Sequence, residues 1–114
     1  MLKKYVVNKT LDTDEYVDIS VEFPDDETEG SMVITREDGE IFEISNEGRA
    51  RIGIAREVQR EAIQTTSIIF NLSPEQEWVR MNVLLNDEII VKHDNSKAVD
   101  EHPTIKLRLL IDTV

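Results

Sequence analysis

The feature that most constrains this chain is the alternation of apolar and polar residues, which has the period of a β-strand. In residues 16–23 every second side chain is apolar, and residues 104–112 repeat the pattern. Such segments bury one face and leave the other in water. The predicted inward residues of these two strands are Val17, Ile19, Val21, Phe23, Ile105, Leu107, Leu109 and Ile111.

Residues 32–44 read as a β-hairpin, because Asp38-Gly39 stands between two apolar runs. Asp and Gly both tolerate the positive φ angles of a two-residue type I′ turn. Such a turn pairs Thr35 with Phe42 and Val33 with Ile44. We therefore expect Val33, Phe42 and Ile44 on one face, in the core.

The C-terminal half continues in the same style. Residues 67–72 predict a strand with Ile68, Phe70 and Leu72 on one face. Residues 78–93 predict a second hairpin, whose register follows from its cross-strand pairs. A three-residue loop over residues 86–88 pairs apolar with apolar and opposite charges with each other. Its predicted pairs are Leu85 with Ile89, Val83 with Val91, Asn82 with Lys92 and Arg80 with Asp94.

Residues 54–64 depart from the strand period. Ile54, Ala55, Val58 and Ala62 recur at helical spacing among good helix formers. We predict one short helix here, lying on the surface because its apolar stripe is narrow.

About eight strands and one helix predict a mainly β fold. The expected architecture is a single antiparallel β-sandwich, a jelly roll or a partly open barrel that comprises residues 1–114 as one domain. A chain of 114 residues can bury about two thirds of its unfolded surface, so it needs no covalent staples.

The chain has no cysteine, which excludes disulfides, thiolate metal sites and cysteine nucleophiles. Its first residues contain only a three-residue apolar run, so we expect no signal peptide. No segment approaches the ~20 apolar residues that span a bilayer. These observations favour a cytoplasmic protein without membrane contact.

The net charge of −11 is unevenly distributed. Residues 11–48 carry 14 acids and a single base, Arg36. Such a field repels nucleic acid and anionic lipid and attracts basic partners. Direct nucleic-acid binding is therefore not expected.

Two groups of residues have some features of a metal site. Asp25, Glu27 and Glu29 imitate the start of a calcium loop, but Arg36 occupies the position that needs a bidentate glutamate. His93 and His102 have no spacing that fixes a metal. We expect a solvated loop and two surface histidines, whose replacement by alanine leaves function intact.

No arrangement of residues indicates catalysis. None of the serines stands in a nucleophile-elbow setting, and there is no glycine-rich phosphate loop. Carboxylate pairs arise by chance in a chain with 24 acids, and few aromatic residues are available to bind a sugar. We predict no cofactor and no enzymatic activity.

The most unusual feature is a group of four arginines within 12 residues of an acidic chain. One interpretation is a docking patch for an acidic surface, and the other is a solvated helix. Three aliphatic residues fall on the polar faces of their strands, where they form an interface or lie under the helix. The candidate interaction residues are Arg49, Arg51, Arg56, Arg60, Ile69, Leu84 and Leu110.

These features favour a non-catalytic protein–protein interaction module that self-associates, most simply as a homodimer weakened by salt and by Arg56→Glu with Arg60→Glu. One alternative is an acidic mimic of nucleic acid that binds the basic groove of another protein. Another is a small-ligand binder or enzyme whose site forms only in the fold.

The charges also predict a neighbour relation between strands. Residues 16–22 present Asp18 and Glu22 outward, and residues 104–112 present Lys106 and Arg108. We therefore expect these two strands to be adjacent in one sheet.

Overall fold

The structure is a computed structural model that describes all 114 residues. It is a β-sandwich of nine strands with one short helix, as the sequence predicts, and it is not a closed barrel. That helix, at four residues, cannot cross a membrane. The elements are β1 (Leu2–Leu11), β2 (Tyr16–Glu22), β3 (Glu29–Thr35), β4 (Ile41–Ser45), β5 (Gly48–Ile54), α1 (Ala55–Val58), β6 (Ile63–Asn71), β7 (Trp78–Leu85), β8 (Glu88–Ser96) and β9 (Thr104–Thr113).

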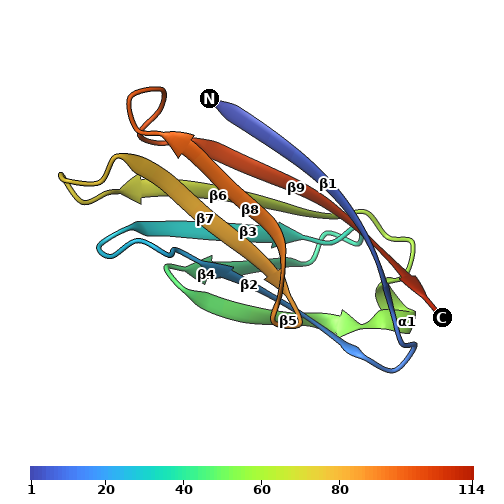
Figure 1. Cartoon of the computed structure of the whole chain (residues 1–114). Coiled ribbons are helices and arrows are strands. Elements are labelled where there is room, and N and C mark those ends of the chain that lie inside the picture. The colour runs from blue at the N-terminus through green and yellow to red at the C-terminus, as the bar shows by residue number, and fades with distance from the viewer.

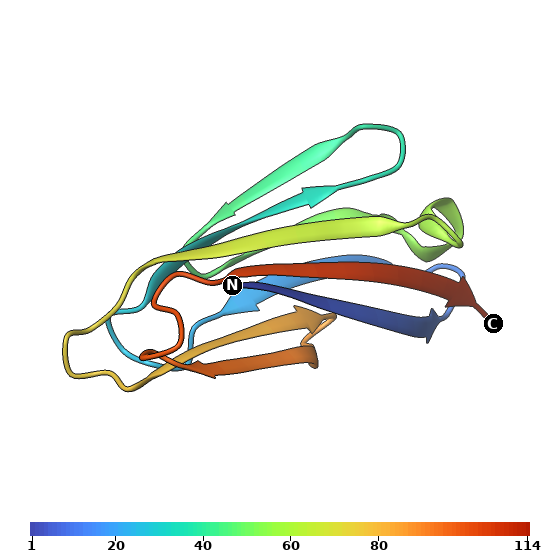
Figure 2. The ribbon, with the colours of Figure 1, turned by 90° about the horizontal axis from the view of Figure 1, so that it is seen from above.

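Two sheets pack against each other (Figures 1 and 2). The five-stranded sheet has the order β1-β9-β6-β3-β4, and the four-stranded sheet has the order β5-β2-β7-β8. All neighbours are antiparallel except β1 and β9, which run parallel from Leu2–Thr104 to Leu11–Thr113. Parallel strands need a long connection, and here the rest of the chain supplies it.

One core of 21 buried apolar residues lies between the sheets. The inward faces predicted for residues 16–23 and 104–112 are confirmed, since all eight apolar side chains are buried. Alternating burial along β2 and β9 shows why: each strand has one apolar face and one polar face.

The β3–β4 hairpin forms, but its predicted register is wrong. The N–H of Arg36 bonds the carbonyl of Glu40 at 2.9 Å, and Gly39 has a φ of 93°. The turn therefore contains three residues instead of two, which moves the pairing by one residue. Ile34 now faces Phe42 and Val33 is exposed, because a one-residue slip turns the side chains of β3 to the opposite face relative to β4. Ile44 is buried and Phe42 packs against the core, as expected.

The face predicted for residues 67–72 is also wrong. β6 starts at Ile63, and its inward side chains are Ile63, Thr65, Ser67 and Ile69. Ser67 lies opposite the buried Ile105 of β9, so the pairing with β9 fixes this orientation. Ile68 and Phe70 consequently point outward and are about half exposed.

The β7–β8 hairpin confirms three of the four predicted pairs. Val83 faces Val91, Asn82 faces Lys92 and Arg80 faces Asp94. The turn itself has two residues, Asn86 and Asp87, with φ angles of 49° and 67°. A bulge after Val83 absorbs the extra residue, so the register far from the turn is the predicted one.

The predicted helix over residues 54–64 is reduced to α1. Ala55 and Val58 are fully buried, so this single turn covers one end of the core rather than lying on the surface. Its free N–H groups are taken by the β1–β2 turn, with Ala55 donating to the carbonyl of Glu15 at 2.9 Å. Arg60, with a φ of 61°, ends any helical continuation.

The predicted adjacency of residues 16–22 and 104–112 is wrong. β2 belongs to the four-stranded sheet and β9 to the five-stranded sheet. Asp18 instead finds a cation on β5, and Glu22 accepts a hydrogen bond from Asn82 on β7. Local charge patterns do not choose between partners that are distant in sequence.

Candidate interaction surface

The arginine segment, residues 49–60, is largely neutralised inside the chain. Arg51 on β5 donates to Asp18 on β2 at 2.9 and 3.2 Å. Its guanidinium lies 3.9 Å from the ring centre of Tyr16. The hydrogen bond from Arg51 holds the pKa of Asp18 below its usual range.

Two further arginines of this segment also have acidic partners. Arg49 pairs with Asp87 in the β7–β8 turn, and Arg56 pairs with Asp14 in the β1–β2 turn. Arg60 is the one member of the four without an ion pair. The segment predicted as a docking patch thus keeps one unpaired cation.

The three aliphatic residues predicted to be exposed do not form one patch. Ile69 is 1% exposed and belongs to the core, so its placement on a polar face is wrong. Leu84 and Leu110 are half-buried and point outward, but from strands of different sheets. α1 covers neither of these outward faces, because its buried side chains enter the core.

A different apolar surface lies on the outward side chains of the five-stranded sheet, here called the outer face. Twelve large apolar residues are exposed in the whole chain, and six of them belong to this face. They are Leu2, Val6, Val33, Ile41, Ile68 and Phe70. Polar residues separate some of them in the register, such as Arg108, Gln64 and Thr35 between Val6 and Ile41, and exposed apolar side chains on one sheet face are candidates for an interaction site.

Charge changes sign across the outer face. One register row runs Lys4, Lys106, Thr66, Val33 and Glu43, from β1 at one edge to β4 at the other. Lys4 and Lys106 are direct neighbours on parallel strands, and like charges in that position are destabilising. The lysine side and the glutamate side of this row lie at opposite edges of the sheet.

Arg108 follows Lys106 on the same face of β9, and we call Lys4, Lys106 and Arg108 the basic end. None of the three takes part in an intramolecular ion pair, and neither does Glu43. A shallow hollow of about 280 Å³, whose lining includes Gln64, opens among these cations. The basic end is therefore an uncompensated positive site in an acidic protein.

The sequence pattern predicts only part of the basic end. The alternation in residues 104–112 predicts that Lys106 and Arg108 point outward, and their exposure confirms it. Residues 2–11 have no pattern from which we predict a strand, so the sequence does not bring Lys4 beside them. The missing signal was the pairing of the first strand with the last, which no local pattern specifies.

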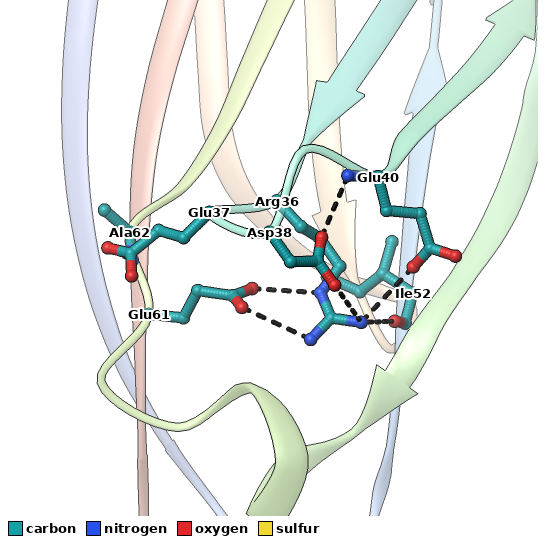
Figure 3. Close-up of polar contacts among 7 residues, drawn as sticks. All are labelled: Arg36, Glu37, Asp38, Glu40, Ile52, Glu61 and Ala62. Carbon is teal, nitrogen blue, oxygen red and sulfur yellow. Dashed lines mark hydrogen bonds and ion pairs between the residues drawn. The ribbon is translucent and has the colours of Figure 1, made fainter.

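Arg36, the single base within residues 11–48, contacts several groups inside the protein. Figure 3 shows the Arg36 guanidinium directed at Glu61, Glu40 and the carbonyl of Ile52. Arg36 donates to Glu61 at 3.0 and 3.2 Å, and this bond raises the pKa of Arg36. Both side chains are mostly buried. The Arg36–Glu61 ion pair therefore connects the β3–β4 turn to the segment that follows α1.

His93 is not the surface histidine that was expected, because it is 2% exposed between the sheets. Asn95 Nδ2 donates to the carbonyls of Ser96 and Asp100, so its Oδ1 accepts from His93 Nε2 at 2.8 Å. Nδ1 is then free to accept from the Tyr5 hydroxyl at 2.8 Å. Burial raises the pKa of Tyr5. This chain of bonds joins β1 to β8 and satisfies a buried imidazole.

A second hollow, of about 580 Å³, lies between the β6–β7 and β8–β9 connections. Trp78 forms part of its wall beside Glu75, Glu77 and Glu101, and Lys97 is held by the carbonyls of Ser73 and Pro74. These side chains hold no nucleophile–base pair.

The calcium-like loop does not assemble a cation site. Asp25 is turned to Arg80 at 3.5 Å, and Glu29 accepts from Asn71 at 3.3 Å. No group of three or more acidic or histidine side chains is close enough to hold a metal ion. Asp25 and Glu29 thus contact separate partners.

Comparisons with protein-family models, with curated proteins and with solved structures find no match for this chain.

Proposed function

We propose that this protein is a non-catalytic assembly module that associates with a second copy of itself through the outer face. The observation that carries the proposal is that six of the twelve exposed large apolar side chains lie on that face. The arginine segment is a weaker candidate, since three of its four cations already have carboxylate partners. A cytoplasmic location fits a chain without cysteine.

The energetics support a contact of this kind. Burying apolar surface contributes about 25 cal/mol per Å², and association must also offset several kcal/mol of lost freedom. A specific interface covers roughly 800 Å² on each partner. The molecule measures 45 by 23 Å along its two longest axes, so one of its faces is large enough.

Light scattering at tens of micromolar in low salt tests the proposal. The expected mass of the wild-type protein is that of two copies. Ile68→Ser removes an exposed side chain from the outer face and is expected to weaken association about tenfold or more. A wild type that stays monomeric under these conditions would overturn the proposal.

The matched control is Ile89→Ser. Ile89 is 48% exposed, close to the 45% of Ile68, but it lies on the four-stranded sheet. The control is expected to associate like the wild type. Equal weakening by both substitutions would mean that the outer face is not the contact.

The acidic mimic of nucleic acid is a second candidate, favoured by a different observation. Of the 24 acidic side chains, only nine take part in ion pairs. Unpaired carboxylates attract basic grooves with steep salt dependence. Displacement of DNA from histone octamers by a monomeric form of this protein, lost at high salt, would favour the mimic.

A further inference from the structure

The order of side chains across the outer face fixes how two copies can meet, and this inference rests on the proposed self-association. We propose that the two copies pair face to face about a two-fold axis that runs along the strands. Glu43 of each copy then lies on Lys4 of the other.

The argument starts from the sheet order. A two-fold axis along the strands exchanges the two sides of the face, so β1 lies over β4 and β9 over β3. β6 is the middle strand and meets itself. Because the axis runs along the strands, each register row meets the same row of the second copy, within the twist of about 30° between packed sheets.

Three contacts then match in character, one in each of three adjacent rows. In the row that holds Lys4, the ammonium group faces the unpaired carboxylate of Glu43. The next row begins with Val6 and ends with Ile41, so these two exposed apolar residues meet. The row on the other side has Ile68 at its centre, and the two copies of Ile68 meet at the axis.

The other face-to-face arrangement does not match. A two-fold axis across the strands would lay β1 over β1 and bring the basic end against itself. With that axis at the row of Lys4 and Lys106, Lys4 would face Lys4 and Lys106 would face Lys106, and like charges across an interface disfavour binding. Charge therefore selects the axis along the strands.

Complementary charge reversal tests the axis. In a K4E pair, two carboxylates face each other at both contacts, and in an E43K pair two ammonium groups do so. Each variant alone is expected to dimerise at least about tenfold more weakly than the wild type. In a one-to-one mixture of the two variants, both contacts bring opposite charges together, so the mass is expected to return to two copies.

The double variant K4E/E43K is expected to dimerise by itself, because both contacts are reversed together. Arg49→Glu is the control, since Arg49 lies on the four-stranded sheet and pairs with Asp87, and it should leave the mass unchanged. Lys4 and Glu43 are both exposed, so folding is preserved, which circular dichroism verifies.

The outcomes separate this inference from the proposed function. If the wild type dimerises but the mixture stays as weak as its components, the axis is wrong and self-association stands. If the mixture forms masses well above two copies, the contact is head-to-tail and the two-fold axis is wrong. If the wild type is monomeric, both proposals fail.

Discussion

At the scale of single residues, the least expected finding is that His93, which lies among polar residues near the end of β8, is buried. His93 keeps both ring nitrogens bonded, one to Tyr5 and one to Asn95. A buried polar atom that loses its partner costs about 1–3 kcal/mol. The hydroxyl of Tyr5 is therefore a structural group.

Tyr5→Phe is expected to lower the free energy of unfolding by about 1–3 kcal/mol, because Nδ1 of His93 loses its donor. Urea denaturation measures the change. Tyr16→Phe is the control, since Tyr16 is 49% exposed, and it should stay within about 0.5 kcal/mol of the wild type. Equal effects of the two substitutions would refute this role of Tyr5.

Gly30 is the glycine with the least space for an added methyl group. A Cβ there would lie 2.5 Å from Cζ of Phe23 and 2.6 Å from the carbonyl oxygen of Ile68. Gly30→Ala is expected to cost about 1–3 kcal/mol through forced displacement of its neighbours. Thermal unfolding beside the neighbouring Ser31→Ala tests this, and a Gly30→Ala protein as stable as that control contradicts it.

At the scale of elements, the pairing of β2 with β5 has a pH dependence. Arg51 lowers the pKa of Asp18, so the ion pair stabilises the fold above the usual carboxyl pKa. That contribution disappears as the pH falls through the lowered pKa of the folded state. Arg51→Gln should therefore differ from the wild type near neutral pH and approach it in strong acid.

Urea unfolding at neutral pH and at about pH 2–3 measures this difference. Arg56→Gln is the control, because its partner Asp14 is 87% exposed and an exposed pair contributes little. A gap between wild type and Arg51→Gln that stays constant across this pH range would show that Asp18 is not the group involved.

The same scale shows what a sequence can predict. β2 and β9 have one apolar face each, so their orientation was predictable. β6 carries apolar residues on both faces, and its orientation depends on its pairing with β9. The β3–β4 register depends on whether the turn at Gly39 has two or three residues, and the sequence allows both. The basic end was not predictable because Lys4 and Lys106 are brought together by strands at opposite ends of the chain.

At the scale of the whole molecule, polar contacts at the edges of the sandwich connect its strands and turns. Lys9 pairs with Glu88, and Tyr5 bonds His93, which joins β1 to β8. Arg36 and Glu61 fix the turn of β3–β4. These contacts leave the outer face uncovered, and that face combines apolar side chains with charges of both signs.

The most direct measurement of the central claim is a dilution series followed by backbone amide NMR. The account predicts concentration-dependent shifts at residues of the outer face, strongest around Thr66 and Ile68, and weaker ones at Lys4 and Glu43. Amides of the four-stranded sheet should hold their positions. Shifts confined to Arg49, Arg51, Arg56 and Arg60, or spectra identical at every concentration, would contradict it.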